Sequence, residues 1–231
     1  MNNQALHIIG ISDSHSHSLP KILKGKKADL LCIVGDWSYK ATSQEIVNFR
    51  EDLLNIRKQF SEIVVVNGNH ELGLEFNIEV SRATADFTDT IYLENEGTTV
   101  HFDNGRELKV WGSPVTPYFG GWAWNAHRGA EIAGYWKEIP EGLDLCLIHG
   151  GIMGLLDVVK WTGEHVGCQD LRDRFDEMEA PPQHFLAGHT HHMGNQQVRH
   201  VTKKGKFMNV YNVAVCDEGY SPTNGVTEFY L

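Results

Sequence analysis

The chain has 231 residues, of which 41% are hydrophobic and 22% are charged. These proportions lie near the averages of globular proteins, and they exclude a disordered chain, a collagen-like fibre and a coiled coil. Acidic residues outnumber basic ones 30 to 20, which gives a net charge of -10. Because this charge repels phosphate backbones and anionic lipids, we expect neither an extended nucleic acid nor a membrane as a partner.

The cysteines and the N-terminus indicate the compartment. Most cysteines lie between apolar neighbours and none forms a C-x-x-C pair, as is usual for buried free thiols in a reducing environment. The first residues carry no basic charge, and no apolar run approaches the roughly 18 residues of a membrane span. We therefore expect a cytoplasmic protein. The four cysteines are Cys32, Cys146, Cys168 and Cys216.

Five short apolar runs, rich in β-branched residues, predict buried strands, since each is too short for a core helix and ends at Gly, Asp, Asn or His. Between the second and third runs, Thr42 and Glu45 form a capping box ahead of apolar residues at helical spacing up to Phe60. This order predicts a β-α-β crossover. The five runs are Leu6–Ile11, Leu30–Val34, Ile63–Val66, Leu143–Ile148 and His184–Ala187.

Further elements follow from turn signals and apolar spacing. The segment Thr98–Trp111 alternates around Asp103-Asn104-Gly105, which predicts a tight hairpin, and a second hairpin is expected to turn at Lys203-Lys204-Gly205 before Phe207–Asn212. No repeat or linker divides the chain. We therefore expect one α/β domain over residues 1–231. Helical spacing also occurs at about Glu75–Thr84, Asn125–Trp136 and Gly167–Glu177.

Polar side chains follow each of the five predicted strands. Since ligand sites of α/β sheets form at the carboxyl ends of strands, these clusters are expected to converge on one site. Glycines before Asp36, Asn69 and His189 allow sharp turns with no Cβ in the way. The clusters are Asp13-Ser14-His15, Gly35-Asp36, Gly68-Asn69-His70-Glu71, His149-Gly150-Gly151 and Gly188-His189-Thr190-His191.

The donor types in these clusters indicate the cofactor. They are carboxylates, an amide oxygen and imidazoles, with no thiolate, which suits Mn, Fe or Zn better than a soft metal or an iron–sulfur cluster. About seven donors are too many for one tetrahedral ion. We therefore expect two divalent metal ions, about 3.5–4 Å apart, an arrangement that serves in-line phosphoryl displacement.

The ordered motifs D-x-H, G-D, G-N-H-E, H and G-H-T-H, from residue 13 to residue 191, resemble the calcineurin-like metallophosphoesterase superfamily. Within it, the chain is most similar to the metallophosphoesterase domain-containing branch. Ile148 departs from the glycine that often precedes the fourth-motif histidine. The segments that carry the closer likeness are Val110–Pro114, Gly121–Asn125, Arg128-Gly129, Val166–Cys168 and Ser221–Asn224.

The resemblance implies a fold, a cofactor and a role for each motif residue. The fold is a β-sandwich, two packed mixed β-sheets flanked by helices. Asp36 would bridge the two ions and contribute to catalysis, and His70 would protonate the leaving oxygen or stabilise the phosphate charge. Asp13, His15 and His191 would hold the first ion, and Asn69, His149 and His189 the second.

Between the third and fourth motifs, residues 118–128 form an aromatic and polar segment that we expect to fold over the ions. In one hypothesis Trp122 or Trp124 stacks on a nucleobase, while Asn125 or Arg128 contacts phosphate or base. In the other hypothesis the two tryptophans fix the loop to the core. Asn69 and His70 complete the predicted substrate-binding residues.

These features predict a metal-dependent phosphoesterase, in which a hydroxide between the ions attacks phosphorus. We expect a phosphodiesterase acting on nucleotides or other small phosphate esters. Two alternatives remain open at this stage: a Ser/Thr protein phosphatase, and a nucleotide-binding or scaffold module with weak turnover. A DNA nuclease fits the acidic composition poorly.

Overall fold

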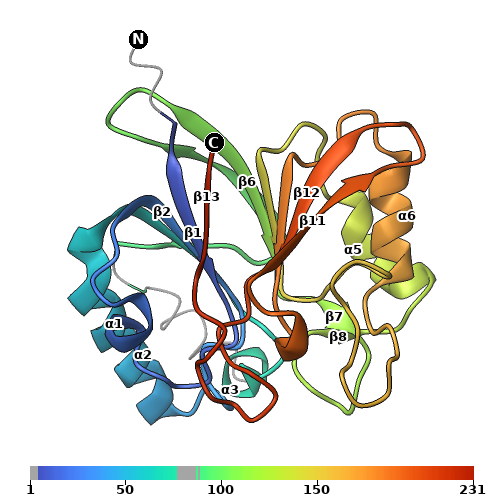
Figure 1. The fold of residues 1–231 in the computed structure, drawn as a ribbon. Coiled ribbons are helices and arrows are strands. Elements are labelled where there is room, and N and C mark those ends of the chain that lie inside the picture. Colours follow the sequence, from blue (N-terminus) through green and yellow to red (C-terminus); the bar gives the residue numbers. More distant parts are fainter. Residues whose placement is uncertain (1–4, 77–86, 88) are drawn as a thin grey trace.

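The computed structural model describes residues 5–76, 87 and 89–231. Within these residues the chain builds two large mixed β-sheets that pack face to face, with helices on both outer sides (Figure 1). This arrangement confirms the expected fold class. The predicted helix Glu75–Thr84 falls almost entirely outside the described residues, which contain the short helix α3 (Leu72–Glu75) just before it.

The first sheet has the strand order β13-β1-β2-β3-β4. Strands β1 to β4 run parallel, with Ile9 opposite Leu31 and Cys32 opposite Val64, while β13 runs antiparallel to β1. The parallel strands β1 to β3 confirm the predicted crossover. The strands are β1 (His7–Ile11), β2 (Ala28–Val34), β3 (Phe60–Val66), β4 (Ile91–Tyr92) and β13 (Thr227–Tyr230).

The second sheet has the order β11-β12-β10-β9-β6-β5. Its four inner strands are parallel, and each edge strand pairs antiparallel with its neighbour. Both predicted hairpins are confirmed, since β5 pairs with β6 and β11 with β12. The strands are β5 (Glu96–His101), β6 (Glu107–Ser113), β9 (Leu145–Ile148), β10 (His184–Ala187), β11 (Gln196–Val201) and β12 (Phe207–Asn212).

Three apolar layers hold these elements together. Because side chains alternate along a strand, Ile8 and Leu30 point into the layer between the sheets, whereas Ile9 and Leu31 point toward the helices on the outer side. A Cβ at Gly10 would lie 2.9 Å from a side-chain carbon of Leu186 and 2.9 Å from one of Val213, so glycine here allows the sheets to approach. The third layer lies between the second sheet and its own helices.

The helices occupy the two outer faces of the sandwich (Figure 1). The predicted capping box of Thr42 and Glu45 is present at the start of α2. Gly129, at φ 91°, directly precedes α5, so the prediction that this helix starts at Asn125 was wrong. Phe60 begins β3 and does not extend α2. The helices are α1 (Leu19–Leu23), α2 (Ser43–Ile56), α5 (Ala130–Lys137) and α6 (Gln169–Glu177).

Backbone hydrogen bonds join the two sheets beside the expected site. Directly after β1, the Ser12 N–H donates to the carbonyl oxygen of Val213 at 2.9 Å, and the Val215 N–H donates to that of Ser12 at 3.0 Å. This connection brings the carboxyl ends of the parallel strands of both sheets to one edge. Among the described residues, no helix is long and apolar enough to cross a bilayer.

Candidate metal centre

Residues from all five strand-end clusters meet at this edge. Three groups of side chains place their ligand atoms within 4.8 Å of one another. Asp36 belongs to two of the groups and His15 to two, so the groups form one continuous centre. The three groups are Asp13, His15 and His191; His15, Asp36 and His70; and Asp36, His149 and His189.

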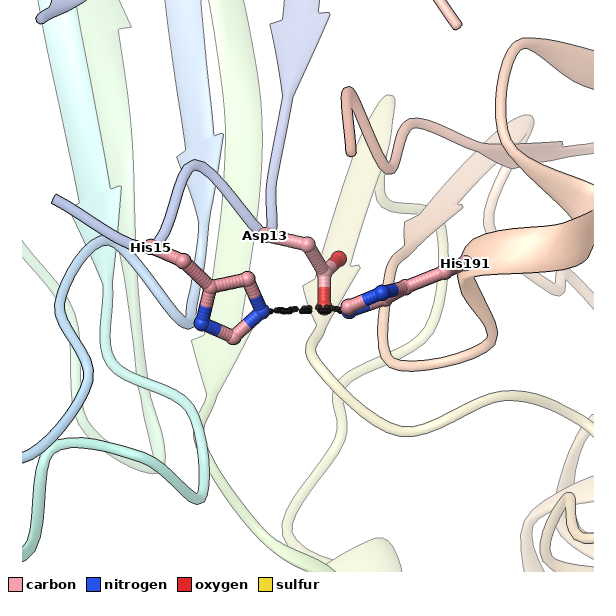
Figure 2. Close-up of side chains that lie close together, drawn as sticks. All are labelled: Asp13, His15 and His191. Atoms are coloured by element: carbon pink, nitrogen blue, oxygen red, sulfur yellow. Dashed lines mark hydrogen bonds and ion pairs between the residues drawn. The ribbon is translucent and has the colours of Figure 1, made fainter. Parts of the chain in front are cut away.

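The first group joins the loop after β1 to the loop after β10 (Figure 2). His191 Nε2 lies 3.2 Å from Asp13 Oδ1, and His15 Nε2 lies 4.0 Å from the same oxygen. The backbone N–H of His189 donates to both oxygens of Asp13, at 3.1 and 3.0 Å. These contacts fix the carboxylate between two imidazoles that come from opposite ends of the motif series.

The third group is built around His149, which follows β9 and is fully buried. Its Nε2 lies 3.2 Å from Asp36 Oδ2 and 3.1 Å from Asn69 Oδ1. The backbone N–H of His70 donates to the other Asp36 oxygen at 2.8 Å. The histidine that lacks the preceding glycine of the family pattern therefore lies in direct contact with the predicted bridging carboxylate.

Backbone carbonyl oxygens fix the tautomers of these imidazoles through their Nδ1 atoms. Nδ1 of His149 lies 2.9 Å from the Val34 carbonyl oxygen, and Nδ1 of His191 lies 3.0 Å from that of Asp217. Because a carbonyl oxygen only accepts, each Nδ1 must carry the proton, and Nε2 is left to bind a metal. His15 has the same arrangement with the carbonyl oxygen of Ser38, at 3.3 Å.

If only Nδ1 of each ring carries a proton, this pattern makes lone pairs face one another inside the centre. His15 Nε2 lies 3.1 Å from His191 Nε2, although the Nδ1 atom of each ring holds a proton. His149 Nε2 likewise faces the oxygen of Asn69. Two acceptors at this distance repel unless a proton or a cation lies between them. The donor set therefore fits divalent ions coordinated by oxygen and imidazole.

Burial and charge divide the imidazoles into two kinds. Burial lowers the pKa of His15 and His189 to about 4, so both rings are neutral near pH 7. For His149, burial is outweighed by the Asp36 carboxylate, which raises the pKa to about 10. Asp13 likewise outweighs burial at His191 and raises the pKa to about 9. Thus His149 and His191 each carry a second proton when no cation competes.

The backbone at the centre is conformationally unusual. Asp13, His15, Asp36 and His189 have φ values of 53°, 41°, 50° and 64°, in the left-handed region that side chains other than glycine rarely adopt. Each such residue costs on the order of 1 kcal/mol or more, and residues of this kind concentrate at functional sites. These sharp turns, in the loops after β1, β2 and β10, direct the four side chains toward one point.

Three glycines leave the space that the ligand side chains occupy. A Cβ at Gly35 would lie 2.5 Å from His149 Nδ1. One at Gly68 would overlap the Asp36 carboxylate, and one at Gly188 would overlap that of Asp13. The sequence predicted a need for these glycines at sharp turns. Gly35, at φ 85°, meets that need, whereas at Gly68 and Gly188 close packing of the predicted ligands is the main reason.

Glu71 is a buried carboxylate that organises two of the loops. Its Oε2 accepts from the backbone N–H groups of Asp36 and Gly68, at 2.9 and 2.7 Å, and its Oε1 accepts from the N–H and hydroxyl of Ser38. Burial and the neighbouring Asp36 carboxylate raise its pKa to about 8. The predicted site residues omitted Glu71, although it belongs to the G-N-H-E motif.

A cavity of about 400 Å³ opens above the centre. Of the predicted substrate-binding residues, Asn69, His70, Trp122 and Arg128 line it. The Trp122 ring stacks on the His70 ring with their centroids 4.3 Å apart. The four are therefore brought together next to the metal centre.

Trp124 and Asn125 are not among the residues that line this cavity. Trp124 packs against the apolar layer between the first sheet and its helices. The Asn125 amide oxygen accepts from the Phe119 N–H at 3.0 Å, and its nitrogen donates to Thr116 Oγ1 at 2.8 Å. Asn125 thus holds the aromatic loop in place. Trp124 packs as the hypothesis that the tryptophans fix the loop to the core predicts.

The segment 217–224 completes the cavity wall, and none of its residues was among the predicted site residues. Tyr220 packs edge-on against His15 and His191, with ring centroids 4.6 and 5.2 Å apart. Glu218 lines the cavity beside it. The sequence signal for this segment was Ser221–Asn224, which carried part of the family likeness but no assigned role.

Comparisons with known proteins agree with this geometry. Residues 6–193 match the family model of the calcineurin-like phosphoesterases. The human and mouse proteins named metallophosphoesterase domain-containing protein 1 are each 28% identical to this chain over 235 residues, which cover 93% of this chain and 67% of the relative.

A solved structure from Staphylococcus aureus, provisionally described as a 5′-nucleotidase, has the same fold. It superposes with a TM-score of 0.54 at 12% identity, over 99% of this chain and 51% of that one. The likeness concerns the fold alone. With the family model spanning most of the sequence, the chain belongs to the calcineurin-like phosphoesterases and is a metal-dependent phosphoester hydrolase.

Proposed function

We propose that this protein is a dimetal phosphodiesterase that hydrolyses nucleotides or other small phosphate esters. The observation that carries the proposal is the pair of contacts in which imidazole Nε2 atoms face other acceptors, His15 against His191 and His149 against Asn69. In the absence of cations, protons on His191 and His149 separate the two atoms of each contact, and cations at these two places would replace those protons. Mn, Fe and Zn suit the oxygen and nitrogen donors.

The proposed ligand sets follow the two ends of the centre. Asp36 is the proposed bridge, because its carboxylate lies within 4.8 Å of ligand atoms of His15 on one side and of His149 and His189 on the other. The first ion would be held by Asp13, His15 and His191, and the second by Asn69, His149 and His189.

When bound, two such ions supply an activated water and neutralise charge on the phosphoryl oxygens. His70 is the proposed acid for the leaving oxygen. Its Nδ1 lies 3.0 Å from the Tyr39 carbonyl oxygen and so carries a proton, which leaves Nε2 on the Asp36 side, 4.0 Å from Oδ2. In the imidazolium form, Nε2–H is the group that can donate to a departing alkoxide.

The size and lining of the cavity suit a phosphate ester with a small organic substituent. Its volume of about 400 Å³ falls in the range typical of small-molecule sites, and its walls include the rings of Tyr118, Phe119 and Trp122. Rings of this kind offer stacking surface to a planar group such as a nucleobase. A small ester therefore fits the cavity better than a folded phosphoprotein does.

The test is a phosphoester panel measured on metal-stripped protein after addition of Mn²⁺, Fe²⁺ or Zn²⁺. We expect hydrolysis of nucleotide diesters with at least one metal, and loss of at least about 100-fold in kcat for Asp36→Asn, because the bridging charge is removed. Retained hydrolysis in Asp36→Asn, or nucleotide binding without hydrolysis under every metal, would contradict the proposal.

A further inference from the structure

The cavity holds one carboxylate that the proposed metal centre does not use. Glu218 lines the cavity, and its Oε1 accepts a hydrogen bond from the backbone N–H of His192 at 3.2 Å. Across the described residues, no lysine, arginine or histidine side chain forms an ion pair with it. Its negative charge therefore faces the cavity without a cationic partner in contact.

The segment that carries this carboxylate is firmly fixed. The side-chain nitrogen Nδ2 of Asn224 donates to the backbone carbonyl oxygens of His191 and Cys216, at 2.9 and 2.7 Å. The Asp217 carboxylate accepts from the N–H groups within its own turn, including that of Ser221 at 3.0 Å. These bonds fix the backbone that carries Glu218 beside the metal centre, and the His192 N–H holds one oxygen of its carboxylate.

Away from the proposed metal centre, the cavity wall has little positive charge to offset this carboxylate. Apart from the proposed metal-site residues and His70, Arg128 is the positively charged side chain of the lining. Its guanidinium donates to the carbonyl oxygens of Gly167 and Val166, at 2.7 and 2.9 Å, and so is committed to the wall. A carboxylate accepts hydrogen bonds from hydroxyl groups and repels a second phosphate.

We propose that Glu218 is a specificity-determining residue, which favours phosphate esters with a neutral, hydroxyl-bearing organic group over esters with a second phosphate. This inference rests on the proposed function, because it concerns the substrate of the same cavity. A dianionic phosphate about 8 Å from a carboxylate, at an effective dielectric constant of about 40 to 80, is disfavoured about 5- to 30-fold.

The experiment uses two substrates that differ in one phosphate, the 5′-(p-nitrophenyl phosphate) esters of thymidine with and without a 3′-phosphate. Both release p-nitrophenolate, so kcat/KM is compared with the same readout. We expect the ratio that favours the ester without the 3′-phosphate to fall about 5- to 30-fold in Glu218→Gln and to fall further in Glu218→Lys. In the wild-type protein the ratio is expected to shrink as salt increases, because ions screen the repulsion.

Glu131→Gln is the matched control, since it makes the same change in net charge on an exposed position of α5 that does not line the cavity. Its substrate ratio should equal that of the wild-type protein. Hydrolysis of both esters with an unaltered ratio in Glu218→Gln would overturn this inference alone. No hydrolysis of either ester by the wild-type protein with any of the three metals would contradict the proposed function itself.

Discussion

At the scale of single residues, the site depends on which nitrogen of each imidazole carries a proton. The backbone carbonyls of Val34 and Asp217 set this for His149 and His191, whose raised pKa values of about 10 and 9 keep both rings charged in the absence of cations. A divalent ion has to displace those protons before it can bind. Metal uptake and proton release are therefore expected to be linked.

The linkage predicts how metal affinity depends on pH. The two rings bind metal only when neutral, and below about pH 9 both are protonated, so lowering the pH strengthens the competition from protons. We expect up to two protons released per chain, and an association constant that falls by up to about 100-fold per pH unit. Calorimetric titration with Mn²⁺ in buffers of different ionisation enthalpy measures both quantities. Affinity that does not change between pH 7 and 8 would contradict the assignment.

His70 gives a second prediction at this scale. His70→Gln removes the proton donor, and we expect kcat to fall about 10²- to 10⁴-fold for esters with poor leaving groups. The loss should be much smaller for p-nitrophenyl esters, since p-nitrophenolate departs without protonation. Comparing kcat for a p-nitrophenyl and an alkyl ester of the same phosphate distinguishes the roles. Equal losses on both would show that His70 binds phosphate and does not protonate the leaving group.

At the scale of elements, the loops after the strands are shaped by the side chains of other loops. Gly68 follows β3, yet an added Cβ would meet the Asp36 carboxylate and backbone nitrogen after β2. Gly68→Ala is therefore expected to weaken Mn²⁺ affinity at least about 10-fold, as changes to supporting residues of metal sites commonly do. The affinity is measured by calorimetry, and circular dichroism confirms that the variant is folded.

The matched control for this element is Gly134→Ala in α5, where nothing lies within 4 Å of the added Cβ. Alanine is favoured over glycine inside a helix by up to about 1 kcal/mol, so this variant should unfold at slightly higher denaturant concentration and bind metal as the wild type does. If Gly68→Ala also bound metal normally, the close packing of Asp36 against Gly68 would not matter for the site.

At the scale of the whole molecule, the metal centre joins the two sheets. Asp13 and His189 follow strands of different sheets and lie 176 positions apart in the sequence. The His189 N–H nevertheless donates to the Asp13 carboxylate. Ions bound at this junction stabilise only the folded state. At about 100 times the dissociation constant, Mn²⁺ is expected to add about 2.7 kcal/mol, which raises Tm by roughly 5–10 °C for a chain of this size.

Thermal unfolding with and without a chelator measures this stabilisation. Chelated protein should also lose hydrolysis and regain it on addition of metal. The Asp36→Asn variant serves as the control, because the removal of its bridging carboxylate should reduce the shift. An equal Tm with and without Mn²⁺ would indicate that the ions do not bind across the two sheets.

The sequence alone predicted the strands, the hairpins, the capping box of α2 and the ordered polar clusters, because alternation, turn residues and caps act over a few neighbouring positions. It missed β13, although the turn residues Asn224-Gly225 precede it, and it began the helix now seen as α5 too early. It also missed the two-residue strands Ile91–Tyr92, Thr116–Pro117 and Asn125–Ala126. Gly129 keeps that helix from starting earlier, through a local backbone conformation that apolar spacing does not reveal.

The sequence by itself determined which donors stand at the strand ends, and hence the class of chemistry. Only the tertiary structure decided how those donors are supported. Glu71 meets Ser38, the Asp217 carbonyl oxygen meets His191, and Asn125 turns inward to Thr116. These contacts join positions that no local pattern relates, so they exist only after the tertiary fold has brought the loops together.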